Sequence, residues 1–139
     1  AKEVRIKMDK DRKIRKNSEY KRIFSRARWI SGKWITIHYL TGESKQSRWG
    51  IVVSKKIGGA VVRNRIRRQI RELCRVLDPF LVKKLDLVIV ARRGIQKINY
   101  WDLLKDAEQV CRKAKFIREG DQIANRKDTD IENTKEDAC

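Results

Sequence analysis

One short apolar stretch, LDLVIVARR at positions 85–93, constrains the fold more than any other part of the sequence. Asp86 is the only charged side chain among its first seven residues, so the stretch has no polar face to turn toward water. Near-continuous apolar runs of this kind are typical of strands buried at the centre of a sheet. We therefore predict a central strand here.

Two further strands are predicted upstream of this run. The segment KWITIHYL, at positions 33–40, alternates between two sides, as a half-buried strand does. One side carries Ile35, Ile37 and Tyr39, and the other carries Trp34, Thr36 and His38. The segment RWGIVVS, at 48–54, follows a polar turn and is expected to pair with the first strand as a hairpin.

Three segments show the spacing of amphipathic helices. Asn17 is expected to cap a short helix with apolar residues at helical spacing, Tyr20, Ile23, Phe24 and Ala27. A second helix is expected from about Val62 to Leu77, where Asp78-Pro79 ends it. Asn99 is expected to cap a long last helix with one continuous apolar face.

The predicted element order is helix, two or three strands, helix, strand, helix, which favours an α+β fold. We predict a two-layer α/β sandwich with a small mixed sheet, in which the segment from the second strand to the apolar run forms a β-α-β unit. We expect a flexible basic arm at residues 1–12, one folded domain at 13–117 and a disordered, acidic-leaning tail at 118–139.

The net charge of the chain, +18, is unevenly distributed. Residues 1–117 hold 32 basic and 11 acidic side chains, a net charge of +21, whereas the tail carries −3. Such a domain repels itself unless a polyanion screens it, so nucleic acid is the expected partner. An anionic membrane surface is the weaker alternative, because the predicted helices lack an exposed apolar face.

We expect a cytoplasmic protein. The first ten residues, AKEVRIKMDK, lack the apolar core of a signal peptide, and no stretch reaches the length of a membrane span. The chain has three widely spaced cysteines and a single histidine, which make no zinc-ligand set. We therefore interpret the cysteines as reduced thiols.

The second predicted helix sorts its residues onto two faces at about 100° per residue. One face is apolar and consists of Val62, Ile66, Ile70, Leu73 and Leu77. The other contains Asn64, Arg67, Arg68, Arg71 and Arg75, with Arg63 and Arg65 flanking it at the helix start. A solvated amphipathic helix is the simplest interpretation of this pattern.

Three features favour a polyanion-binding face instead. Acid–base pairs four residues apart are almost absent, although a merely soluble surface gains from them. The side chains are Arg, whose planar guanidinium fits phosphate oxygens. Positive charge also crowds the helix N-terminus, where the helix dipole disfavours it unless an anion binds there. The periodicity does not say which polyanion binds.

The string SKKIGGAVVRNRIRRQIRE, at positions 54–72, resembles the signature of the bacterial ribonuclease P protein family. RKNSEYKRIF, SGKWITIHYL and LDLVIVARR are similar to the family's first helix, first strand and central strand, so the resemblance covers about residues 11–117. It implies a small basic protein cofactor of a catalytic RNA that removes the 5′ leader from precursor tRNA. It also implies a left-handed β-α-β crossover, against the usual right-handed rule.

The resemblance further implies two RNA-binding sites. The catalytic RNA is expected to bind Lys55, Lys56, Arg63, Asn64, Arg65, Arg67, Arg68 and Arg71. The single-stranded leader is expected in a cleft between the first helix and the sheet, at Tyr20, Phe24, Thr36, His38 and Ser54. Aromatic faces stack on unpaired bases with little sequence preference. From the residues alone, a core position for Phe24 is slightly favoured over stacking, and the resemblance reverses this order. His38 departs from the aromatic residue expected at its position.

We expect no catalytic residue in the protein itself. No Cys–His pair, paired carboxylates or Gly-rich phosphate loop stands out, and Asp86 and Asp102 are interpreted as isolated strand-start and helix-cap residues. We expect no cofactor bound by the protein alone, with Mg²⁺ required by the RNA-containing holoenzyme. No membrane or obligate protein partner is expected. The alternative function is a structural RNA-binding protein, similar to a ribosomal protein, which needs the basic face but not the aromatic cleft.

Overall fold

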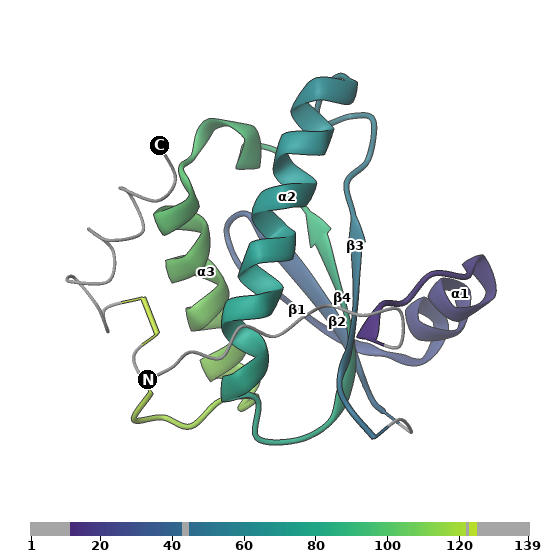
Figure 1. Cartoon of the computed structure of the whole chain (residues 1–139), viewed down its shortest axis with the longest axis vertical. Coiled ribbons are helices and arrows are strands. Elements are labelled where there is room, and N and C mark those ends of the chain that lie inside the picture. The colour runs from purple at the N-terminus through teal and green to yellow at the C-terminus, as the bar shows by residue number, and fades with distance from the viewer. Residues whose placement is uncertain (1–11, 43–44, 122, 125–139) are drawn as a thin grey trace.

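A computed structural model of the chain describes residues 12–42, 45–121 and 123–124 (Figure 1). These residues form three α-helices, one four-stranded sheet and two short 3-10 helices. Along the chain the elements are α1 (Asn17–Arg26), β1 (Arg28–Ser31), β2 (Ile35–Thr41), β3 (Arg48–Val52), α2 (Ala60–Leu77), η2 (Asp78–Phe80), β4 (Leu85–Ala91), η3 (Ile95–Lys97) and α3 (Tyr100–Lys113). The order agrees with the predicted order that contains a third strand before the second helix.

Strand β4 lies inside the sheet, whose strand order is β1-β2-β4-β3. It pairs antiparallel with β2 and parallel with β3, so the sheet is mixed. Six of its seven residues are buried, because strands cover both of its edges and helices cover both of its faces. The predictions of a buried central strand and of an α+β fold with a small mixed sheet are confirmed.

The predicted hairpin between the segments at 33–40 and 48–54 is wrong. Strands β2 and β3 are not neighbours, because β4 pairs with both of them and lies between them. The antiparallel partner of β2 on its other side is β1, which the sequence analysis did not identify. Alternation within a strand predicts which residues share a face, but it does not predict which strand lies alongside.

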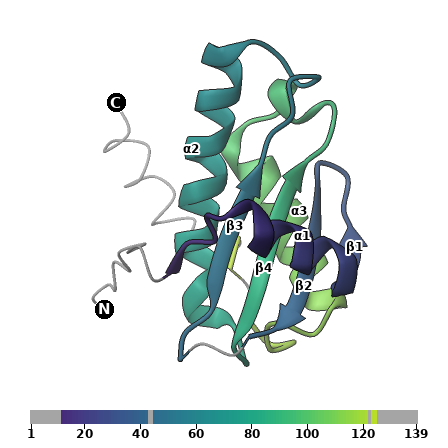
Figure 2. The same cartoon turned by 90° about the vertical axis from the view of Figure 1, so that its right-hand side faces the viewer.

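Helices cover the sheet on both faces. Helices α2 and α3 lie on one face and α1 lies on the other, as two perpendicular views show (Figures 1 and 2). The main core lies between the sheet and α2 and α3, whereas a smaller cluster of Ile14, Ile23 and Val88 lies under α1. In Figure 2, β3 and β4 run upward, α2 joins them behind the sheet, and β4 lies to the right of β3. The crossover is therefore left-handed.

Helix α2 buries one face and exposes the other, as its periodicity predicts. Its shielded side chains are Ile66, Ile70, Leu73, Cys74 and Leu77. The cap of α3 is also as predicted, since the Asn99 side chain accepts a hydrogen bond from the backbone N–H of Asp102 at 2.8 Å. None of the helices in the described residues is long and apolar enough to span a membrane.

The start of α1 differs from the prediction, because Asn17 is the first helical residue rather than the cap. The cap position belongs to Lys16, whose backbone is extended. The Glu19 carboxylate accepts a hydrogen bond from the N–H of Lys16 at 3.4 Å. A glutamate three residues into the helix thus satisfies a backbone donor that the helix itself leaves free.

The domain boundaries stay a prediction, because most of the arm at 1–12 and of the tail at 118–139 lies outside the described residues. Where the structure describes these two segments, parts of them pack against the domain. Arg12 is buried, and Ile123 and Ala124 belong to the main core. At these residues the folded part reaches past both predicted boundaries.

Truncation of Ile70 tests the division of α2 into two faces. Ile70 is fully shielded, so Ile70→Ala leaves a cavity, and we expect the free energy of unfolding to fall by about 2–5 kcal/mol in urea denaturation. Val61→Ala is the control on the same helix. Val61 is 84% exposed, and its truncation should change stability by less than about 0.5 kcal/mol. Equal losses in the two variants would contradict the assignment of the faces.

Candidate nucleic-acid interface

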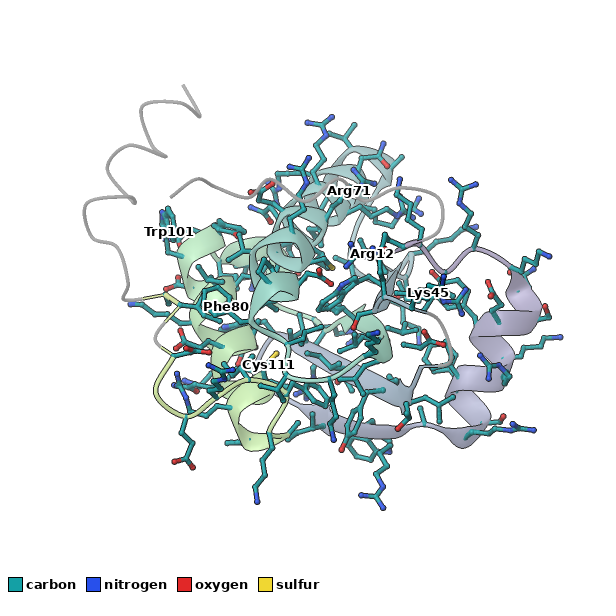
Figure 3. All side chains as sticks on the ribbon, turned by 60° about the horizontal axis from the view of Figure 1, so that its bottom comes forward. Arg12, Lys45, Arg71, Phe80, Trp101 and Cys111 are labelled. Atoms are coloured by element: carbon teal, nitrogen blue, oxygen red, sulfur yellow. The ribbon has the colours of Figure 1, made fainter. Side chains whose placement is uncertain are left out.

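The outward side of α2 carries a set of basic and polar residues that we name the arginine face: Arg63, Asn64, Arg65, Arg67, Arg68 and Arg71. Four of these residues are exposed and two are half-buried. Arg71, which Figure 3 labels on α2, is one of the exposed residues. Because the opposite side of α2 is packed in the core, the helix brings all six residues together toward solvent, as the sequence predicts.

The guanidinium groups of the arginine face have neutral hydrogen-bond partners. Three of them donate to oxygens 2.9–3.1 Å away: Arg63 to the carbonyl of Gly58, Arg65 to that of Gln96, and Arg67 to the side-chain amide of Asn64. Within the described ranges, no carboxylate forms an ion pair with any arginine of this face. This part of the chain therefore leaves their positive charge without a neutralising partner.

Arginines that face the interior are paired with acids instead. The Arg48 guanidinium lies 3.2 Å from Asp86 and 2.8 Å from Glu19, and that of Arg12 lies 2.5 Å from Asp78. The hydrogen bond to Asp86 is the main cause that raises the pKa of Arg48, so this group stays charged. A buried charge is strongly destabilising without such a partner. The chain thus neutralises Arg12 and Arg48 with Asp78 and Asp86, two acids whose side chains are shielded from water.

The turn before α2 continues the basic surface. Lys55 and Lys56 are exposed and precede Gly58 and Gly59. Helix α2 has no acidic residue in its first turn, although the backbone N–H groups there lack acceptors within the helix. Such a helix start attracts anions. The two lysines and the helix start therefore extend the positive surface of the arginine face.

Three rings lie together on the face of the sheet opposite to α2. We name them the aromatic surface: Tyr20 and Phe24 from α1 and His38 from β2. The ring centroids of Tyr20 and Phe24 lie 6.3 Å apart with planes at 30°, and Phe24 meets His38 edge-on at 4.8 Å. Phe24 is 42% exposed. The alternative in which Phe24 is a core side chain is therefore wrong.

An ion-pair network fixes α1 on the sheet. Arg48 on β3 bridges Glu19 on α1 and Asp86 on β4, and Arg22 on α1 lies 3.5 Å from Asp86. The hydrogen bond from Arg48 lowers the pKa of Glu19. Asp86 is 2% exposed and is bound by two arginines, so its interpretation as an isolated residue is wrong. The network holds the aromatic side chains of α1 over the sheet.

Tyr20 packs on a position that has no side chain. A Cβ added to Gly50 on β3 would come within 2.7 Å of the Tyr20 hydroxyl and 2.9 Å of its ring. The Tyr20 hydroxyl donates a hydrogen bond to the carbonyl of Ile14 at 3.0 Å. Burial raises the pKa of Tyr20, so the hydroxyl keeps its proton for this bond. Gly50 therefore allows the close approach of α1 to the sheet.

The two hydroxyl residues predicted in the leader site lie in different settings. Thr36 is two residues before His38 on β2, so both side chains point to the same face of the sheet. The hydroxyls of Thr36 and Ser31 share a hydrogen bond of 2.9 Å. Ser54 is exposed and lies just beyond the end of β3. The fold places Thr36 beside the aromatic surface and Ser54 at the end of β3, next to Lys55.

His38 presents a neutral ring to this surface. Burial lowers the pKa of His38 from its usual 6.5, so the imidazole is uncharged at neutral pH. Its Nδ1 atom is buried and has no hydrogen-bond partner in the part of the chain that the structure describes. A neutral planar ring offers a face for stacking rather than a cation for phosphate.

Two features of this side were not identified from the sequence. The pairing of Arg48 with Asp86 joins residues that are far apart in the chain, and only the fold brings them together. Trp29, whose role the sequence leaves open, lies on β1 directly opposite His38 and is 63% exposed. The register that places it there depends on β1, for which the sequence analysis found no signal.

Substitution of Gly50 tests whether this residue sets the position of Tyr20. In Gly50→Ala the new methyl group pushes the Tyr20 ring outward and strains its hydrogen bond to Ile14. We expect urea denaturation to show a loss of about 1–3 kcal/mol in the free energy of unfolding.

Gly120→Ala is the matched control, because a Cβ there has no neighbour within 4 Å. Its stability should stay unchanged or rise by up to about 1 kcal/mol. If Gly50→Ala is as stable as this control, Tyr20 does not depend on the close approach at Gly50.

Comparison with known proteins points to one family. The family model described as Ribonuclease P matches residues 8–115. A ribonuclease P protein component from Syntrophomonas wolfei is 37% identical over 117 residues, which cover 84% of this chain and 98% of the relative. Another, from Streptococcus equi subsp. equi, is 33% identical over 119 residues, with 86% and 99% covered.

Solved structures agree with this result. The RNase P protein of Staphylococcus aureus superimposes with a TM-score of 0.71 at 29% identity, covering 77% of this chain and 98% of that one. The RNase P protein from Thermotoga maritima shares the fold, with a TM-score of 0.62 at 22% identity. Because the family model and the relatives match most of its length, this chain belongs to the ribonuclease P protein family, whose members are RNA-binding proteins of tRNA processing.

Proposed function

We propose that this protein is a cofactor of ribonuclease P with two separate RNA-binding surfaces. The arginine face, together with Lys55 and Lys56, binds the catalytic RNA. The aromatic surface, together with Thr36 and Ser54, binds the single-stranded 5′ leader of precursor tRNA. The protein thereby assists the endonucleolytic removal of the leader, which gives mature tRNA 5′ ends, and it contributes no catalytic residue of its own.

The observation that carries this proposal is the division of the arginines into two groups. Arg12 and Arg48 each pair with a buried acid and hold the fold together. The six residues of the arginine face have no acidic partner in the described residues, although a surface made only for solubility would mix charges of both signs. Arg75, one turn further along α2, is the exception on this helix and pairs with Glu72 at 3.0 Å. Unpaired guanidinium groups on a rigid helix fit the phosphates of a folded RNA.

The aromatic surface supports the leader-binding part of the proposal. Leaders differ in sequence among tRNAs, so a site that accepts them all cannot depend on base-specific hydrogen bonds. Stacking on Phe24 and on the neutral ring of His38 tolerates any base, because every base has a flat face. Phe24 is exposed enough to receive one.

The arrangement of the two surfaces supports simultaneous binding of both RNAs. Helix α2 lies on one face of the sheet and α1 lies on the other (Figure 1). A leader on the α1 side therefore does not compete for the arginine face with the catalytic RNA.

The Mg²⁺ that the holoenzyme requires is assigned to the RNA as part of the same proposal. Asp78 and Asp86, buried acids that could otherwise attract a cation, each pair with an arginine. The contribution of the protein is positive charge beside the RNA and a grip on the leader. The alternative is a structural RNA-binding role, similar to that of a ribosomal protein. This alternative does not account for the aromatic surface.

Two sets of variants test the two surfaces in the reconstituted holoenzyme. Arg67→Ala with Arg71→Ala removes two phosphate-binding charges, so catalytic-RNA binding should weaken and its log–log salt slope should fall by about 1.5. Phe24→Ala should weaken precursor tRNA binding by about 5- to 150-fold, because one stacked base contributes about 1–3 kcal/mol. Mature tRNA should bind this variant like the wild type.

Matched controls separate these effects from general changes in charge and packing. Lys105→Ala with Lys113→Ala removes the same charge from exposed positions of α3, and Val82→Ala truncates another exposed apolar residue. Both should bind normally. If Phe24→Ala weakens mature and precursor tRNA alike, the leader site is misassigned. If the wild-type protein does not stimulate cleavage by a bacterial ribonuclease P RNA at low Mg²⁺, the proposed function is wrong.

A further inference from the structure

Trp29 on β1 is an unpartnered aromatic residue beside the aromatic surface. It is 63% exposed, more than Phe24. Among the described residues its indole makes no ring contact and donates no hydrogen bond. An indole left in water forgoes the large stabilisation that its burial provides, and exposed aromatic groups with polar surroundings commonly mark binding surfaces. Trp29 therefore needs an explanation beyond the fold.

The register of the sheet places Trp29 in line with the aromatic surface. Trp29 lies directly opposite His38, His38 lies opposite Val88, and Val88 lies opposite Gly50, on which Tyr20 packs. Residues directly opposite one another point to the same face of a sheet. The neighbouring residue Ile30 packs against the main core on the other face, which agrees with this direction.

The four rings form a series that crosses the sheet from α1 to its outer edge. Tyr20 and Phe24 are 6.3 Å apart, and Phe24 and His38 are 4.8 Å apart. The Cβ atoms of directly opposite residues in an antiparallel pair, such as His38 and Trp29, are about 4.5–5.5 Å apart. Trp29 thus extends the series by one further aromatic residue on the next strand of the sheet, with an indole that is free of contact with the other three rings.

The charges around Trp29 favour a nucleotide as its partner. Arg26, at the end of α1 and three residues before Trp29, is exposed, and in the described ranges it forms no ion pair with an acid. A guanidinium close to an indole offers a phosphate contact beside a stacking face. Strand β1 is also an outer strand of the sheet, so no further strand of this sheet lies beyond it.

We propose that Trp29 stacks on a further unpaired nucleotide of the leader, about one or two positions along from the nucleotide held by Phe24 and His38. The inference rests on the proposed function, because it takes the leader as the occupant of the aromatic surface. The leader then runs across the sheet from α1 to β1, and nucleotides beyond His38 contribute to affinity.

A series of precursor tRNAs with leaders lengthened one nucleotide at a time tests this in the reconstituted holoenzyme. As the leader lengthens, the affinity of the wild-type holoenzyme for precursor tRNA, relative to mature tRNA, should rise in two steps. Trp29→Ala should lose only the second step, by about 5- to 150-fold, which corresponds to a stacking contribution of about 1–3 kcal/mol. Trp29→Phe should keep part of that step, and Phe24→Ala should lose the first.

Each result distinguishes the inference from the proposed function. If Trp29→Ala binds leaders of every length like the wild type while Phe24→Ala does not, the inference is overturned and the proposed function stands. If neither variant responds to the leader, both fail. If Trp29→Ala weakens binding of the catalytic RNA without tRNA, the stacked base belongs to that RNA, and the inference is overturned. Thermal unfolding of each variant verifies that removal of this exposed ring leaves the fold intact.

Discussion

Strand β4 is buried on both faces, and the positions of the other elements follow from the need to cover it. Helices α2 and α3 cover one face, and α1 covers the other. Because β3 runs parallel to β4, the chain must cross over between them, and α2 makes this crossing. The arginine face and the aromatic surface therefore come to lie on opposite sides of one small sheet.

The positions of the acidic residues determine which arginines form ion pairs within the fold and which keep an unpaired charge at the surface. The interior has few acids, and those of the sheet region are paired: Asp86 with Arg48 and Arg22, and Asp78 with Arg12. This pairing turns basic residues into links between α1, the sheet and the end of α2. The arginine face has no comparable partner among the described residues, so its charge is available to a polyanion, which also relieves the self-repulsion of a chain with net charge +18.

The sequence predicts those parts of the fold that depend on local pattern. The apolar run of β4, the two faces of α2 and the Asn99 cap of α3 are all confirmed, because each follows from the burial or the backbone geometry of one segment. Pairing between segments is different. The predicted hairpin is wrong, since β4 enters between β2 and β3. The positions of Trp29 and Gly50 next to the aromatic surface follow from the register between strands, which cannot be predicted from the sequence of one segment.

The central claim is that the two faces of the sheet contact different RNAs at the same time, and a tethered cleavage probe tests it most directly. Cys74 and Cys111 are buried, and burial raises the pKa of both thiols, so they should not react with the probe. In a Cys139→Ser background, the exposed positions Ser25 on α1 and Glu72 on α2 can each be changed to cysteine and labelled with a hydroxyl-radical probe. In the complex with catalytic RNA and precursor tRNA, the account predicts cuts in the leader from Ser25→Cys and cuts in the catalytic RNA from Glu72→Cys. Cuts in the leader from both positions, or cuts in the catalytic RNA from Ser25→Cys alone, would contradict it.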